Sequence, residues 1–193
     1  MTTTEITPIT RIEDGTEVPV AGDYVLDASH SHVGFSVRHA MVSRTKGQFA
    51  EVDGTIHIAE NPLESWVEVD IAVGSLDTRD EKRDGHLRSA DFFDADNHPT
   101  VHYRSTKVTP ADDSRWVVEG ELTVKGVTRP VGLEVTFEGG AKDPWGNSRI
   151  GFTARAEVNR EDFGLTWNQA LETGGVLVGK QVRIDIEAEA VHQ

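Results

Sequence analysis

The residues best suited to chemistry are three histidines within ten positions, His30, His32 and His39, in the stretch DASHSHVGFSVRHAM (27–41). The H-x-H spacing of the first two places both imidazoles on one face of a strand, which is a reasonable start for a metal site. Imidazole alone does not select a metal, however, and the chain has no cysteine to add thiolate ligands. We therefore predict no metal site and interpret these histidines first as part of the lining of a barrel.

Catalytic motifs are missing from the sequence: it contains no G-x-S-x-G, no H-E-x-x-H and no G-x-x-x-x-G-K-[ST]. Asp27, His30 and Ser29 or Ser31 supply the residue types of a Ser–His–Asp triad. A triad is defined by geometry, however, and neighbours on a strand point to opposite faces. We therefore predict no catalytic residue and a protein that is not an enzyme.

The elements that must position these residues show a period of two. In VGFSVRHAM the side chains that share one face are Val33, Phe35, Val37, His39 and Met41. Arg38 lies on the other face, where we expect it to be solvated or paired with a carboxylate. Similar alternation at 66–73, 131–137, 152–158 and 182–186, and further expected strands at 47–59, 100–108 and 115–124, predict an antiparallel all-β barrel or sandwich.

Two segments break the alternation. Residues 78–99 predict a short helix, capped by Thr78 or Asp80, although Gly85 in its middle is unfavourable. Its apolar anchors would be Leu87, Phe92 and Phe93. Residues 159–180 form a second irregular segment, which carries Phe163, Leu165 and Trp167. Both segments are candidates for a lid over a barrel end.

Charge and the first residues restrict location and partners. With 19 Lys and Arg against 33 Asp and Glu, the net charge is −14, which repels nucleic acid and anionic lipid headgroups. The start of the chain lacks the basic and apolar regions of a signal peptide, and no run reaches the ~18 apolar residues of a spanning helix. We expect a cytoplasmic protein without membrane insertion, with residues 1–23 as a flexible N-terminal arm.

Several ordered motifs resemble the YceI-like family of polyisoprenoid-binding proteins. They are DASHSHVGFSVRHAMVS, SLDTRDEKRDGHLRSADFFDADNHPT, GELTVKGVTRPV, VNREDFGLTWN and VRIDIEAEA. The resemblance runs from about Tyr24 to Val191 in the same order. It implies an all-β fold, an extended antiparallel eight-stranded lipocalin-like barrel with one or two short helices, over residues 24–193.

The resemblance also implies a binding or carrier protein that encloses a long apolar molecule: a polyisoprenoid, an isoprenoid quinone or a fatty-acid-like lipid. The family pattern has histidine at His30, His39 and His86, whereas His32 and Gly85 depart from it. The predicted ligand-binding residues are Phe35, Val37, His39, Met41, His30, His86, Phe93, Ala154, Ala156, Phe163 and Trp167. His39 and His30 would orient a headgroup, the aromatic side chains would wall or cover the tunnel, and the alanines would leave room.

Two alternative hypotheses stay open. The first is a metal-binding or enzymatic protein that uses His30, His32, His39 and His86 on a hydrophobic substrate. The second is a stress-related interaction protein with a filled barrel, whose acidic surface or arm recruits a partner. Apart from a bound isoprenoid or quinone lipid, no cofactor is expected, and a seam along one strand would allow a homodimer.

Overall fold

The computed structural model describes residues 8–112 and 114–193. The strands are β1 (Thr10–Glu13), β2 (Thr16–Pro19), β3 (Gly22–Leu26), β4 (His32–His39), β5 (Ser43–Phe49), β6 (Val52–Ile58), β7 (Trp66–Ala72), β8 (Leu76–Asp77), β9 (Thr100–Asp112), β10 (Arg115–Val124), β11 (Val127–Lys142), β12 (Ser148–Asn159) and β13 (Val178–His192). The helical elements are α1 (Glu81–Arg88) and the 3₁₀ turns η1 (Ala28–His30), η2 (Pro62–Glu64), η3 (Val73–Ser75) and η4 (Arg160–Phe163). No helix among these residues is long and apolar enough to cross a membrane.

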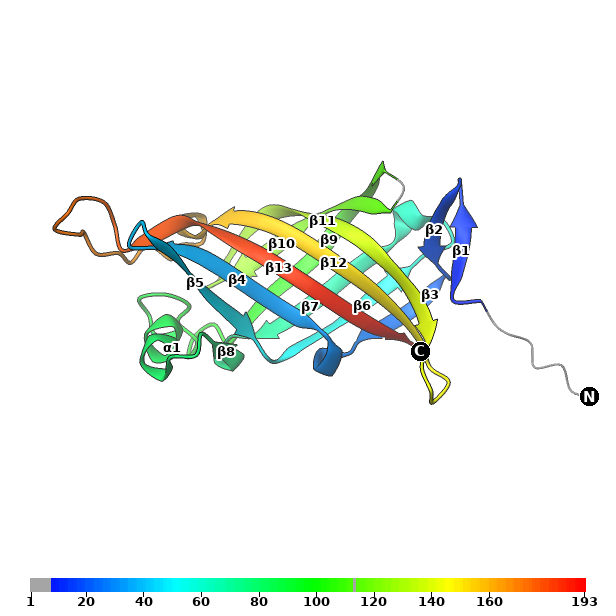
Figure 1. Ribbon diagram of the computed structural model, residues 1–193, viewed down its shortest axis with the longest axis horizontal. Helices are drawn as coiled ribbons and strands as arrows, with labels where there is room; N and C mark the ends of the chain where they lie inside the picture. The colour runs from blue at the N-terminus through cyan, green and yellow to red at the C-terminus, as the bar shows by residue number, and fades with distance from the viewer. Residues whose placement is uncertain (1–7, 113) are drawn as a thin grey trace, which may run out of the picture.

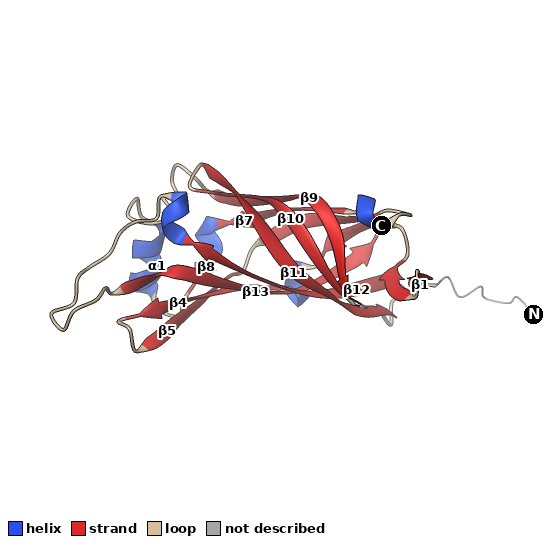
Figure 2. Ribbon diagram, turned by 90° about the horizontal axis from the view of Figure 1, so that it is seen from above, coloured by secondary structure: helices blue, strands red, loops and turns tan. Residues whose placement is uncertain are grey.

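Eight strands form a closed antiparallel barrel, elongated along its axis (Figures 1 and 2). Their order is β12-β11-β10-β9-β7-β6-β3-β13, and pairing of β13 with β12 closes the ring. This arrangement confirms the predicted all-β, lipocalin-like barrel with a short helix. The alternation of apolar and polar residues fits it because a barrel wall has one face in the lumen and the other in water.

The wall changes partners along β13. Its C-terminal part, Ala190–His192, pairs with β3, whereas Val178–Glu187 pairs with β4. Beyond β4 the sheet continues through β5 to the short strand β8. The chain therefore leaves the barrel wall after β7, runs through η3, β8 and α1, and returns at β9, so α1 lies beside one end of the barrel (Figure 1).

Each end of the barrel has its own apolar core. At the end beside the β1–β2 hairpin, called here the β1–β2 end, Tyr24, Ile150 and Ala190 are almost completely buried. At the opposite end, the α1 end, the buried side chains come from η3, from the loop after α1, from the barrel strands and from the segment after β12. They are Val73, Phe92, Val101, Tyr103, Leu122, Val124, Phe163 and Leu165.

The expected flexible arm differs from the structure in the part that can be described, because residues 10–19 form the β1–β2 hairpin. Arg11 fastens this hairpin to the barrel by donating to the carbonyl oxygens of Ala59 (2.9 Å) and Glu60 (2.5 Å). Val18 is buried. Four-residue strands are too short to show alternation in the sequence. The rest of the expected arm, residues 1–7, lies outside the described residues, and the boundary at residue 23 stays a prediction.

Helix α1 begins where its sequence predicts. The Asp80 carboxylate accepts a hydrogen bond from the backbone N–H of Arg83 (3.0 Å), which is an N-cap. Asp84, in the first turn, is buried and accepts from both the backbone and the hydroxyl of Thr78 (2.9 and 2.5 Å). Gly85 is tolerated in mid-helix, and the two bonds from Thr78 fix α1 against β8.

Candidate functional site: the apolar lumen of the barrel

The lumen of the barrel contains a cavity of about 340 Å³. This volume lies within the range of small-molecule sites, roughly 300–1,000 Å³. The apolar side chains that line it come from nearly every barrel strand. They include Val33, Phe35, Val37, Phe49, Val67, Val69, Ile71, Leu133, Val135, Phe152, Ala154, Val182, Ile184 and Ile186. The inward phase of each predicted strand therefore forms one continuous apolar surface.

Four polar side chains on this lining, Tyr103, Ser31, Ser65 and Arg160, have partners within the protein. The Tyr103 hydroxyl donates toward the carbonyl oxygens of Val118 (3.1 Å) and Val131 (3.2 Å). Burial raises the pKa of this hydroxyl well above its usual range, so it remains a donor. Ser31 bonds to the backbone of Glu189, and Ser65 accepts from the backbone of Ala59. The cavity wall thus leaves little hydrogen-bonding capacity for a guest.

Arg160 is the charged residue of the lining, and it acts on the backbone. Its guanidinium is buried and donates to the carbonyl oxygens of Leu165 (2.6 Å), Gly179 (2.8 Å) and Trp167 (2.9 Å). A further bond reaches Val178. Burial lowers the pKa of this guanidinium, although an arginine stays charged at neutral pH. Arg160 therefore ties residues 164–179 across the α1 end of the cavity.

Aromatic side chains surround the same end. Phe35 contacts Phe49, with ring centroids 5.6 Å apart, and Phe49 contacts Phe93 at 5.9 Å. Phe92 precedes Phe93 in the chain, and the centroid of the Trp167 ring lies 5.4 Å from that of Phe92 and 4.7 Å from that of His86. Because Phe92 and Phe93 follow α1 whereas Trp167 follows η4, both predicted lid segments meet at this end of the barrel.

Five of the eleven predicted ligand-binding residues lie on the cavity lining: Phe35, Val37, Phe93, Ala154 and Phe163. The other six are not lining residues. They are His30, His39, Met41, His86, Ala156 and Trp167. Among these, His86 and Trp167 pack on the outer side of Phe92, and Ala156 faces Ile184 two residues beyond Ala154. Whether any of the eleven contacts a ligand stays a prediction.

The expectation that His39 and Met41 line the lumen on the same strand as Phe35 is wrong, and His30 is not on the lining either. His30 belongs to η1, because the chain makes a capped turn between β3 and β4, and its side chain is exposed. β4 ends at His39, beside Val178 of β13 and outside the cavity. Met41 lies in the following turn with a φ of 63° and is 53% exposed. The period of two thus extends beyond the C-terminal end of the actual strand.

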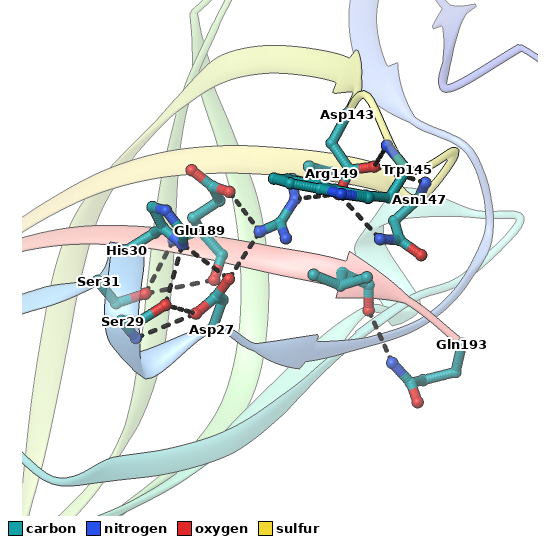
Figure 3. Close-up of polar contacts among 11 residues, drawn as sticks. Asp27, Ser29, His30, Ser31, Asp143, Trp145, Asn147, Arg149, Glu189 and Gln193 are labelled. Carbon is teal, nitrogen blue, oxygen red and sulfur yellow. Dashed lines mark hydrogen bonds and ion pairs between the residues drawn. The ribbon is translucent and has the colours of Figure 1, made fainter.

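His30 belongs instead to a polar network at the β1–β2 end (Figure 3). Arg149 donates to Asp27 (2.7 Å), Glu189 (2.6 Å) and Asp143 (2.8 Å), and Asp27 also accepts from Ser29 (2.6 Å). The guanidinium of Arg149, aided by Ser29 and then His30, holds the pKa of Asp27 far below its usual range. The network therefore joins the start of β4 to β12 and β13.

This network has neither triad nor metal-site chemistry. The same atom of His30, Nδ1, faces both Asp27 (2.9 Å) and Ser29 Oγ (3.1 Å), so the ring cannot relay a proton from one to the other. Asp27, His30 and Glu189 are close enough to share a cation. The two carboxylates already bind the positive charge of Arg149, however, which opposes a metal ion there.

Residues that matter for the cavity were missed by sequence reasoning. Arg160 stands in the charged run NRED, which is typical of a solvated loop, and only tertiary structure reveals its four backbone acceptors. Val18 and Pro19 line the other end of the cavity although they belong to the expected arm. The one available signal was the lone apolar pair Val18 and Val20 around Pro19, which is too short for a period.

Comparison with known proteins agrees with this architecture. The model of the YceI-like domain matches residues 24–190. This chain belongs to the YceI-like domain family. A UPF0312 protein of Staphylococcus aureus strain N315 is 36% identical over 169 residues, which cover 86% of this chain and 96% of that relative.

Solved structures share the fold of this YceI-like protein. BcnA of Burkholderia cenocepacia superposes with a TM-score of 0.75 at 22% identity, covering 85% of this chain and 98% of BcnA. A polyisoprenoid binding domain from Saccharophagus degradans, implicated in plant cell wall breakdown, gives a TM-score of 0.64 at 16% identity over 88% and 98% of the two chains. At these identities the two structures show a shared fold.

Proposed function

We propose that this YceI-like protein binds one long-chain apolar molecule in the barrel lumen and carries or stores it. The observation that carries the proposal is the continuous apolar lining of the 340 Å³ cavity, on which Tyr103 and Arg160 are hydrogen-bonded to the protein itself. A guest rich in hydroxyl or charged groups would lose its bonds to water there without replacement. An apolar chain has no such cost.

Burial supplies the affinity in this mechanism. Each CH₂ removed from water contributes about 0.8 kcal/mol, so a long prenyl or acyl chain binds tightly without polar contacts. Phe35, Phe93 and Phe163 would wall the chain. Because the lining is mostly apolar, we expect selection by length and shape and little selection by headgroup.

The class of cargo is a polyisoprenoid, an isoprenoid quinone or a fatty-acid-like lipid. A structural neighbour described as a polyisoprenoid binding domain supports the first of these. A headgroup contact by His39 and a cover formed by His86 and Trp167 at the α1 end belong to this proposal as well, whereas His30 lies at the other end of β4. A cytoplasmic location, a homodimer and a part in stress response stay predictions, for which fractionation, sedimentation and expression measurements are the tests.

The first experiment is organic extraction of natively purified protein with mass spectrometry of the extract, together with native mass spectrometry of the intact complex. We expect one dominant prenyl, quinone or acyl species near one per chain. A folded protein that never retains such a molecule, even after incubation with prenyl alcohols and fatty acids, contradicts the proposal. Stoichiometric metal in place of lipid would favour the metal-dependent alternative.

Site-directed variants distinguish lipid binding in the lumen from lipid binding on the outer wall. Ala154→Trp places a large ring in the cavity, and we expect lipid retention to be lost. Arg155→Trp is the matched control, because the neighbouring side chain points into solvent and is 79% exposed. Equal lipid retention by both variants would show that the cargo lies elsewhere.

A further inference from the structure

The hairpin β4–β5 has a charge unlike that of the rest of the chain. From Ala28 to Ala50 there is no Asp or Glu, whereas Arg38, Arg44 and Lys46 are all present, in a chain that has 33 acidic residues. All three basic side chains are exposed. The hairpin is therefore a local basic surface on an acidic protein.

Two of these cations face each other across the hairpin. Arg38 and Arg44 are direct partners in the β4–β5 register, an arrangement in which like charges destabilise a sheet. Among the described residues, neither of them nor Lys46 forms an ion pair, whereas Arg183 on β13 pairs with Glu157 and Lys180 with Glu161. The expected partnership of Arg38 with a carboxylate is thus absent from the described contacts. The hairpin carries uncompensated positive charge.

The turn of the same hairpin exposes apolar side chains. Met41 is 53% exposed and Val42 is 83% exposed. The neighbouring loop adds Val176, which is 38% exposed, and the Ala40 backbone bonds to Leu177 of that loop at 2.7 Å. Met41, Val42 and Val176 are called here the apolar tip. The β4–β5 turn, which carries Met41 and Val42, lies at the α1 end of the barrel (Figure 1).

Folding alone does not account for the residues at this tip. Ala40 and Met41 both have positive φ, 47° and 63°, which glycine or asparagine adopts more easily. A turn chosen for stability and solubility would carry those residues or polar ones. Strained backbone and exposed apolar side chains at one place are typical of a contact surface.

We propose that the β4–β5 hairpin docks the protein on an anionic lipid bilayer, with the apolar tip entering the interface and Arg38, Arg44 and Lys46 meeting the headgroups. The net charge of −14 does not prevent this, because charges beyond a Debye length of about 8 Å are largely screened at physiological salt. The local charge decides the contact. Glu172 is the carboxylate of the adjacent loop, and it opposes docking.

The location suits exchange of an apolar molecule with a membrane. Val37 and Val178 line the cavity, and each lies within four residues of the apolar tip or its loop. Docking would therefore bring the α1 end of the lumen next to the bilayer. The docking surface lies outside the lumen, so it can be tested separately from the proposed cargo.

The test is flotation of the full-length protein with vesicles of phosphatidylcholine alone and with vesicles that also contain phosphatidylglycerol. We expect binding to the anionic vesicles, weaker binding to the neutral ones, and a loss of binding as salt is raised. Arg44→Glu with Lys46→Glu should weaken binding at least about tenfold, since each basic residue near an anionic surface contributes roughly fivefold. Lys107→Glu with Lys142→Glu reverses two exposed charges elsewhere and should change binding little.

The apolar contribution is tested by Met41→Ser with Val42→Ser, against a control of Ile12→Ser with Trp145→Ser, which removes exposed apolar side chains at the β1–β2 end. Only the first pair should lose vesicle binding. Ala154→Trp, with a blocked lumen, should still bind, which distinguishes docking from cargo uptake. Wild type that stays unbound, tip variants that bind like wild type, or a tip that mediates self-association without vesicles would overturn the proposal.

Discussion

The two ends of the barrel are closed in different ways. At the β1–β2 end, side chains interlock: Tyr24, Ile150 and Ala190 are at most 1% exposed, and Arg149 joins three carboxylates beside them. At the α1 end, an irregular segment crosses the opening, and the buried Arg160 holds it mainly by hydrogen bonds to backbone carbonyl oxygens. Both ends thus contain a buried apolar core, but at the α1 end residues 164–179 also lie across the opening and are hydrogen-bonded to Arg160.

This difference indicates where a guest can enter. Global stability depends on tightly packed side chains, and local opening occurs where few apolar contacts have to break. We therefore expect the β1–β2 end to unfold only with the whole domain. The α1 end can open by releasing residues 164–179, and it is also the end with the apolar tip. The following predictions test this contrast.

The largest effect is expected from Ile150→Ala at the β1–β2 end. Ile150 is 1% exposed, and removing its buried atoms should lower the free energy of unfolding by about 2–5 kcal/mol, measured by urea denaturation. Val42→Ala, at an 83% exposed position of the α1 end, should change it by less than about 0.5 kcal/mol. Similar losses for both variants would remove the contrast between the ends.

Arg160→Met should act on the α1 end selectively. It leaves the carbonyl oxygens of Leu165, Gly179 and Trp167 without their donor, at a cost of about 1–3 kcal/mol for an unsatisfied buried group. We expect faster hydrogen exchange in 164–179, unchanged exchange in β3, and faster release of a bound lipid. Arg155→Met, on the outer wall, is the control and should change none of these.

Acid should weaken the β1–β2 end. Arg149 holds the pKa of the Asp27 and Asp143 carboxyls well below the usual 3.8, so both bind protons more weakly when folded than when unfolded. Their contribution to stability is complete well above the unfolded pKa of 3.8 and decreases as the pH falls from about 5 toward the lower folded pKa. Urea denaturation of wild type at a series of pH values should show this decrease, and Arg149→Met should show a shallower one. Parallel pH curves would exclude the network as the cause.

The smallest expected effect concerns Gly164, which ends η4 with a φ of 77° at the start of the covering segment. Gly164→Ala forces a side chain into the left-handed region, and we expect a loss of about 1 kcal/mol in denaturation measurements. Gly85→Ala is a control of opposite sign: Gly85 lies in mid-helix with open space around it, so alanine should stabilise by about 0.5–1 kcal/mol. A stabilising Gly164→Ala would contradict the observed backbone at η4.

Most of the fold could be predicted from the period-two alternation of apolar and polar residues in the sequence. Strands such as β7 and β13 have apolar side chains at every second position because one face of each lines the lumen, so their inward residues were predictable without coordinates. The Asp80 cap of α1 was predictable for an equally local reason. Within the predicted site, the same rule gave Phe35, Val37 and Ala154 as lining residues.

The rule was wrong where strands end. It extended β4 forward to Met41, although a tight turn ends the strand at His39, because periodicity does not record where a partner strand stops. It also gave no sign of Arg160, whose acceptors lie between 5 and 19 residues away along the chain. These positions depend on which strands become neighbours.

The sequence by itself thus determined an antiparallel all-β barrel or sandwich with an apolar interior, a short capped helix and no cysteine chemistry, since alternation, capping and composition are local properties. Tertiary structure alone decided that Arg149 pairs with carboxylates at one end and that Arg160 bonds to backbone carbonyl oxygens at the other. It also decided that Arg38 lies opposite Arg44 on the outer wall. The physical reason is register: closing the ring sets which distant residues meet, and no local pattern encodes that choice.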